Sequence, residues 1–223
     1  MTAGPWLLVI DTATNVVVVA AARPDGDLIA SRSFEAGHRH GSHLLPTIDG
    51  LTEAEGLALA DLAGIVVGTG PGAFTGLRVG LATAKTLAHA LGVPIVGIST
   101  ADALLGGATG AGCDLVLLPA GMRELVEVRR GQAASLVSLP LEASEADGAI
   151  AVDLEGRAPA GALARGRRAV GELAATLARL GAAELGAGGR SDPETLVPEY
   201  VTLPRGAGAP PDDGGVAWSR DPR

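Results

Sequence analysis

A glycine-rich segment at residues 68–80, with the sequence GTGPGAFTGLRVG, carries the strongest chemical signal in the chain. It lies between a short apolar run and a long stretch of helical periodicity, where glycines can present backbone N–H groups to a phosphate. However, Pro71 removes one such donor, and no Lys-Ser or Lys-Thr pair follows Gly76 as a P-loop requires. The segment therefore matches a phosphate-binding loop only in part.

The same segment is also typical of a helix that packs closely against its neighbours. Small residues recur at every fourth position, at Gly72, Gly76, Gly80, Ala84 and Ala88. An adjacent apolar stripe consists of Leu77, Leu81, Ala84 and Leu91. Each glycine inside a helix costs about 0.5–1 kcal/mol relative to alanine, so a row of them indicates close approach of another backbone. The helix can face two neighbours, either both within this chain or one of them in another protein.

A polar turn follows the first apolar run of the chain and reads Asp11, Thr12, Ala13, Thr14, Asn15. An acidic, hydroxyl-rich turn at this place could hold a phosphate and its metal, but it lacks the glycine that lets a phosphate approach the backbone. Two uses stay open. One is a residual contact with a nucleotide or partner through Asp11, Thr12, Thr14 and Gly70; the other is local satisfaction of backbone groups by these side chains.

Metal and nucleophile chemistry find little support in the residue pattern. Three histidines cluster before or at the start of the first expected helix, at His38, His40 and His43. Cys113 is the only cysteine, and no third or fourth ligand can be named, so we expect no metal site. Ser99 lacks the second glycine of a nucleophile elbow and an identifiable base. We therefore expect no catalytic residue in this chain.

The composition limits the class of protein. The chain has 223 residues, a formal charge of −8, 47% hydrophobic residues and 2% aromatic residues, which excludes fibrous and disulfide-rich classes. The acidic balance argues against nucleic-acid binding by this chain alone. A single cysteine fits a reducing compartment, and neither a secretion signal nor a membrane span is evident. We expect a soluble, cytoplasmic protein.

The expected order of elements is β-β-β-α-β-α-β-α, typical of an α/β layered lobe. Strands are predicted at residues 6–10, 16–22, 28–34, 65–67 and 95–98, and helices at residues 43–54, 73–91 and 99–105. Pro46 is compatible with the first helix only if the helix begins within a residue or two of His43. Ser99 is expected to cap the third helix.

The second half of the chain gives weaker patterns. Short strands are predicted at residues 114–118, 124–129, 135–139 and 149–153. One amphipathic helix is marked by Val170, Leu173, Leu177 and Leu180. Beyond residue 205 the chain is rich in Gly, Pro and Asp, which predicts a disordered tail. The expected division is a first lobe at residues 1–105, a second lobe at residues 106–204 and a tail at residues 205–223.

Several of these stretches together resemble the bacterial TsaB family, also called YeaZ. They are LLVIDTATNVVVVAA, RHGSHLLPTID, and IVVGTGPGAFTGLRVGLATAKTLAHALGVPIVGIST, and the resemblance covers roughly residues 6–105. It implies an actin-like fold of two lobes, of the sugar-kinase, Hsp70-type ATPase and ribonuclease H-like kind. It also implies a non-catalytic subunit that binds and activates a TsaD-type transferase in the synthesis of threonylcarbamoyladenosine on tRNA. The paired His-x-x-x-His of TsaD is missing here, which is consistent with the non-catalytic relative.

The resemblance also implies which residues meet the partner, through the helix at residues 40–51 and the helix that begins at Gly72. They are His40, Leu44, Ile48, Leu51, Gly72, Phe74, Thr75, Gly76, Arg78, Val79, Gly80 and Thr83. A TsaE-type ATPase subunit and a homodimer of the isolated chain are further possible partners. We expect tRNA to be held mainly by the partner and the isolated chain not to bind ATP.

The second half departs from the family pattern. A usual Asp-Ala-Arg segment is replaced by residues 119–121, Pro-Ala-Gly, and the usual Pro-x-Tyr-Leu-Arg-Arg near the C-terminus appears as PEYVTL. The alternative function is an ATP-dependent phosphotransferase or ATPase of the same fold that uses Asp11 and the loop at residues 68–72.

Overall fold

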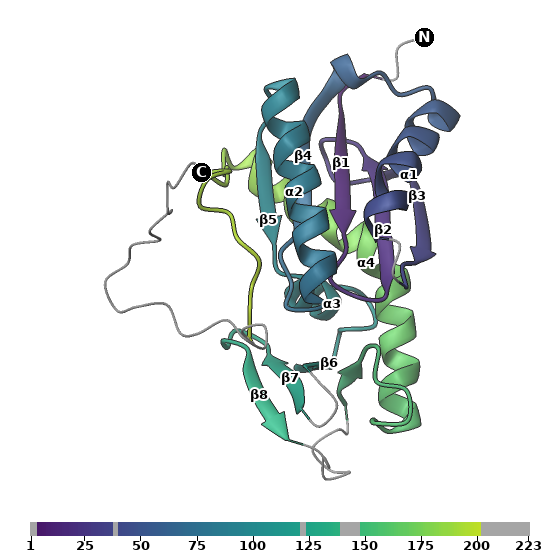
Figure 1. Cartoon of the computed structure of the whole chain (residues 1–223), viewed down its shortest axis with the longest axis vertical. Helices are drawn as coiled ribbons and strands as arrows, with labels where there is room; N and C mark the ends of the chain where they lie inside the picture. The colour runs from purple at the N-terminus through teal and green to yellow at the C-terminus, as the bar shows by residue number, and fades with distance from the viewer. Residues whose placement is uncertain (1–3, 38–39, 121–123, 139–147, 202–223) are drawn as a thin grey trace, which may run out of the picture.

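The computed structural model describes residues 4–37, 40–120, 124–138 and 148–201 (Figure 1). The first half contains β1 (Trp6–Asp11), β2 (Val16–Ala22), β3 (Leu28–Glu35), α1 (His40–Glu55), a 3-10 turn (Leu59–Asp61), β4 (Leu62–Gly68), α2 (Phe74–Leu91), β5 (Ile95–Ile98) and α3 (Thr100–Gly106). The second half contains β6 (Leu115–Pro119), β7 (Glu124–Arg129), β8 (Ser135–Ser138), β9 (Ile150–Ala151) and α4 (Ala160–Gly186). The predicted order of elements is confirmed.

The first sheet has five strands in the order β3-β2-β1-β4-β5. Its first three strands are antiparallel neighbours, whereas β4 and β5 join by parallel pairing, as crossover helices require. Successive side chains point to opposite faces, so Leu7 and Val9 lie in one core cluster and Trp6 and Leu8 in another. Helices α1 and α2 cover one face, and α3 and α4 cover the other (Figure 1).

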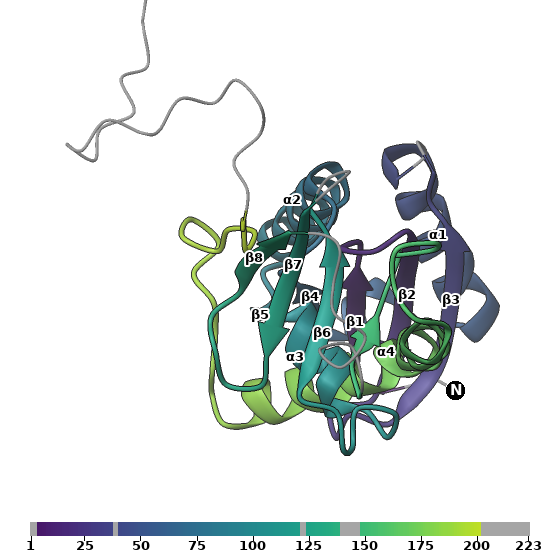
Figure 2. The same cartoon turned by 90° about the horizontal axis from the view of Figure 1, so that it is seen from below.

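The second sheet repeats this design on a smaller scale, in the order β8-β7-β6-β9, with β9 parallel to β6. Helix α4 links the two halves, because its first part lies on β9 and its last part lies under the first sheet (Figure 2). The backbone of Gly166 approaches Ala151, and Gly181 approaches Val66. One core cluster thus runs through both sheets, and the predicted division into separate lobes stays a prediction.

Two boundaries differ from the sequence prediction. Helix α1 begins at His40, so Pro46 lies inside the helix, where its ring faces solvent. Helix α4 extends well beyond its predicted core in both directions, because small residues such as Ala162 and Ala182 carry its buried face outside the leucine pattern. Ser99 caps α3 as predicted, accepting a hydrogen bond from the Asp102 amide at 3.3 Å.

The predicted tail at residues 205–223 lies outside the described residues. Among the helices that the structure does describe, none combines the length and apolar character needed to cross a bilayer.

Two glycines of α4 should respond oppositely to alanine. A Cβ at Gly166 would overlap the Ala151 carbonyl, whereas Gly171 has open space around it on the same helix. We expect Gly166→Ala to lower the free energy of unfolding by about 1–3 kcal/mol and Gly171→Ala to raise it by about 0.5–1 kcal/mol. Urea denaturation followed by circular dichroism measures both. Equal effects of the two substitutions would contradict the packing of α4 on β9.

Candidate functional site

The turn between β1 and β2 is built around the Asp11 carboxylate, which is fully buried. The Ala13 amide donates to its Oδ1 at 2.9 Å, and the Thr100 hydroxyl donates to its Oδ2 at 2.6 Å. Gly68 lies so close that a Cβ there would overlap the carboxylate. Asp11 therefore joins the end of β1 to the end of β4 and to the first residue of α3.

Burial raises the pKa of Asp11 from 3.8 to about 6, while the hydrogen bonds from Thr100 and Ala13 act in the opposite direction. None of the salt bridges found within the described residues reaches this carboxylate. An ionised Asp11 is consequently compensated by hydrogen bonds from neutral donors alone, which makes its charge costly to the folded state.

The glycine row of α2 packs against the β1–β2 turn of the same chain. The Thr12 hydroxyl donates to the Gly76 carbonyl at 2.8 Å, and the Ala73 amide donates to the Ala13 carbonyl at 2.7 Å. A Cβ at Gly72 would overlap the Ala13 carbonyl, and one at Gly80 would overlap the Thr12 hydroxyl. This corrects the assignment of Gly72, Gly76 and Gly80 to a seam with a partner, because the neighbour that they admit is internal.

These contacts occupy the place where a phosphate would meet the start of α2. The Gly70 amide donates a hydrogen bond to the Thr100 hydroxyl at 3.2 Å, and the Gly70 carbonyl accepts one from the Thr100 amide at 2.7 Å. The Thr14 hydroxyl donates to the Val16 carbonyl at 2.9 Å. The structure thus brings Asp11, Thr12 and Gly70 together as predicted, but it commits their polar groups to partners within the chain. The residues present do not fit a phosphate group at this turn.

Thr100 is the member of this cluster that sequence reasoning missed. It connects Asp11 to Gly70 and is fully buried, yet nothing in its neighbourhood resembles a motif. The available signal was its place directly after the helix cap Ser99, at the carboxyl end of β5. That edge of a sheet is where the carboxyl ends of parallel strands bring their residues together.

The outer side of α1 and α2 carries an apolar groove of about 450 Å³, here called the helix groove. It is lined by Leu8, Leu45, Pro46, Ile48, Asp49, Thr52, Leu59, Leu62, Leu87 and Leu91. Leu45 is 52% exposed, and Leu59 and Leu91 are also exposed. Exposed apolar side chains gathered in this way are typical of an interaction surface.

Most of the apolar α1 side chains predicted to face the partner do not lie on this surface. Leu44, Ile48 and Leu51 are buried against the chain's own sheet, and only Ile48 also reaches the floor of the helix groove. The burial of Leu44 and Leu51 corrects their assignment as partner-contacting side chains, whereas contact of Ile48 with a partner stays a prediction. The 44/48/51 spacing marks the core-facing stripe, and the exposed stripe begins one residue later, at Leu45.

The remaining predicted interface residues occupy the outer half of α2. Thr75 and Arg78 are exposed, and Phe74, Val79 and Thr83 are half-buried. The Arg78 guanidinium lies 3.8 Å from the centre of the Phe74 ring. That they contact a partner stays a prediction. The side chain of His40 lies outside the described part of the structure, and so does His38.

Within the described residues, no group of three or more histidine, cysteine, aspartate or glutamate side chains is arranged to hold a metal ion. His43 instead packs its ring 5.8 Å from that of Phe34.

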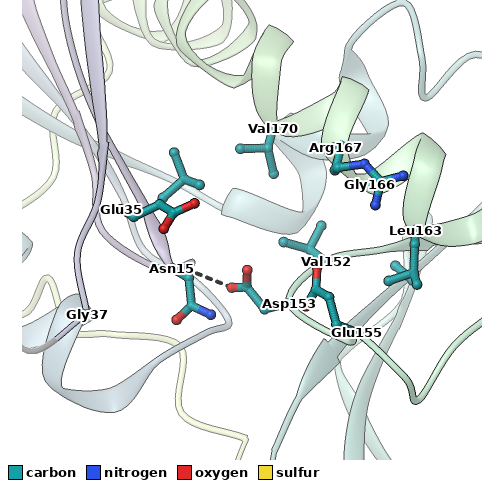
Figure 3. A pocket seen from close by; sticks show the side chains of 12 residues that line it. Asn15, Glu35, Gly37, Val152, Asp153, Glu155, Leu163, Gly166, Arg167 and Val170 are labelled. Atoms are coloured by element: carbon teal, nitrogen blue, oxygen red, sulfur yellow. Dashed lines mark hydrogen bonds between the residues drawn. The ribbon is translucent and has the colours of Figure 1, made fainter.

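A second cavity, of about 620 Å³, lies between the two halves of the chain (Figure 3). The Glu35 and Asp153 carboxylates face each other across it, with Arg167 of α4 on the far side (Figure 3). The backbone N–H of Asn15 donates to the Asp153 carboxylate at 2.7 Å, and burial raises the pKa of Asp153. Sequence reasoning missed this cavity because its walls come from four separate segments. Among the described residues that line it, none carries a hydroxyl, thiol or imidazole that could act as a nucleophile.

Fold and site together define an α/β protein of two sheets whose β1–β2 turn is packed against α2 and α3 and whose outer helices carry an apolar groove. Residues 34–145 of the 223 match the family model described as TsaD: tRNA N6-adenosine threonylcarbamoyltransferase. The model covers half of the chain, and the chain belongs to this family. The named relatives below confirm the resemblance to TsaB within it.

The similar proteins with curated names include two TsaB proteins. The tRNA threonylcarbamoyladenosine biosynthesis protein TsaB of Bacillus subtilis is 34% identical over 126 residues, which are 56% of this chain and 52% of that protein. TsaB of Escherichia coli is 37% identical over 103 residues, 46% and 43% of the two chains. An uncharacterised protein of Mycobacterium tuberculosis is 40% identical over 124 residues, and the matched part spans 58% of its length.

The crystal structure of YeaZ from Pseudomonas aeruginosa shares the fold. It aligns with a TM-score of 0.63 at 24% identity over 88% of this chain and 99% of that one. The predicted α/β fold class is thereby confirmed, and the structure adds that it is built on two sheets.

Replacing Asp11 by Asn should change how stability depends on pH. Because the pKa of Asp11 is raised in the folded protein, its contribution to stability is fully present below about pH 4 and is lost as the pH rises through about 6. We expect the free energy of unfolding of Asp11→Asn, relative to that of the wild type, to rise by about 2–3 kcal/mol between pH 4 and pH 8. Denaturant unfolding at several pH values measures this difference. A difference that does not change with pH would show that Asp11 stays ionised in the fold.

Proposed function

We propose that this chain is a non-catalytic subunit that binds and activates a TsaD-type transferase in the biosynthesis of threonylcarbamoyladenosine on tRNA. The observation that carries the proposal is the helix groove. It is an apolar surface on the outer side of α1 and α2, the two helices that pack on the chain's own sheet with their other side. The names of the B. subtilis and E. coli relatives support the pathway.

The shape of the helix groove suits a partner of related fold. The family model matched at residues 34–145 includes both α1 and α2, so a TsaD-type protein carries a corresponding pair of helices. Two similar helix pairs can pack face to face about a pseudo-twofold axis, each covering the apolar groove of the other. Removing exposed leucines from water supplies the driving force, at about 25 cal/mol for each Å² of apolar surface.

The closed turn supports a role without catalysis. Asp11, Thr12 and Thr100 use their polar atoms to hold β1, α2 and α3 together. An ATP-dependent phosphotransferase would need these groups for phosphate and metal, so the alternative function finds no support in their geometry. We propose that the isolated chain does not bind ATP at this turn.

The other partners follow from the same proposal. With a charge of −8, the chain is poorly suited to hold tRNA by itself, and we propose that the transferase makes most RNA contacts in the cytoplasm. A TsaE-type ATPase subunit would join the assembly. The isolated chain would use its exposed groove to form a homodimer at high concentration.

A charge in the helix groove should abolish the complex without unfolding the chain. Leu45 is 52% exposed, so Leu45→Glu removes little from the core but places a carboxylate in the apolar contact. We expect at least a tenfold loss of affinity for the TsaD-type protein of the same genome, measured by isothermal titration calorimetry.

Leu136→Glu is the matched control, because Leu136 is 45% exposed on β8 in the second sheet. It should bind like the wild type. If the wild type binds and Leu45→Glu binds equally well, the partner does not occupy the helix groove.

A further inference from the structure

We propose that residues 196–201, here called the strap, form a second contact surface for the same TsaD-type partner, on the side of α2 away from α1. The inference rests on the proposed function and extends it beyond the helix pair. It depends on three observations: the strap is fixed in place, its Val197 and Tyr200 side chains are exposed, and a groove separates it from α2.

The strap is fixed to the first sheet and to α2 by directed contacts. The Lys85 ammonium donates to the Leu196 carbonyl at 3.1 Å, and the Glu199 amide donates to the Thr69 carbonyl at 2.8 Å. The Leu196 side chain fills the space beside Gly97, where a Cβ would come within 2.6 Å of it. A surface fixed in this way can be bound with little further loss of chain entropy.

An aromatic contact fixes the other end of the strap. The Tyr200 ring lies 5.1 Å from the Phe74 ring of α2, and the Arg78 Nε donates to the Tyr200 hydroxyl at 3.0 Å. Two of the residues predicted to face the partner, Phe74 and Arg78, therefore carry the strap. A partner that reaches them also meets Tyr200.

Large apolar side chains are exposed on the strap as well as at the helix groove. In the described residues, the large apolar side chains that are exposed are Leu45, Leu59, Leu91, Leu136, Val197 and Tyr200. Three of them line the helix groove, and two, Val197 and Tyr200, lie on the strap. Only Leu136 belongs to the second sheet. Figure 1 shows the strap beside β5 and α2, with α1 on the other side of α2.

A groove of about 460 Å³, here called the strap groove, separates α2 from the strap. Its walls combine Leu81, Ala82 and Val197 with the cations Arg78 and Lys85. Helix α2 thus stands between two grooves of similar size, the apolar helix groove and a strap groove with basic residues. The chemistry predicts a partner segment that places an apolar side chain on Val197 and a carboxylate beside Arg78.

The test is Val197→Glu, because Val197 is 63% exposed and its replacement leaves the core intact. We expect an unchanged melting temperature and at least a tenfold loss of affinity for the TsaD-type protein. The new carboxylate would lose its hydration water in the complex and would be repelled by the partner's carboxylate. Leu136→Glu again serves as the control and should bind normally.

The possible outcomes separate this inference from the proposed function. If Leu45→Glu loses binding while Val197→Glu binds like the wild type, the strap is not a contact surface and the proposed function stands. Stronger binding by Val197→Glu would show that the strap competes with the partner, and it would overturn the inference. Absence of binding by the wild type would refute the proposed function itself.

Discussion

The contact between the β1–β2 turn and the glycine row of α2 determines most of what this structure can do. Thr12 and Ala13 pack directly on Gly72 and Gly80, where a Cβ would overlap them, and the Thr12 hydroxyl donates to the Gly76 carbonyl. Because the helix lies this close, the turn has no space for a phosphate. The same closeness presses α2 onto the sheet, so the helix offers its opposite side to other molecules.

Two consequences of this contact support each other. The polar residues that could have served chemistry, Asp11 and Thr100 above all, are buried and hydrogen-bonded to one another. Among the described residues, five of the six exposed large apolar side chains line the helix groove or lie on the strap, and the sixth, Leu136, lies on β8. An exposed apolar surface of this kind is typical of a site that binds another protein.

Sequence patterns predicted the element order, the Ser99 cap and the closeness of Asp11 to the glycine-rich loop. They could not show which side of α2 the glycines face, since a smooth ridge suits an internal turn as well as a partner. Nor could they show that Leu45, and not Leu44, is available to a partner. Periodicity locates the buried stripe of a helix, but the packing of the folded chain determines which other apolar side chains stay exposed. Thr100, the strap and the cavity at Asp153 depend on residues far apart in the chain, and no local pattern encodes them.

Hydrogen–deuterium exchange of the full chain, with and without the TsaD-type protein, tests the central claim most directly. The account predicts slower exchange in α1, α2 and residues 196–201 when the partner is added, with β6, β7 and β8 unchanged, because burial of the outer helices suppresses their local opening. Protection confined to the second sheet, or no protection at any concentration, would contradict it.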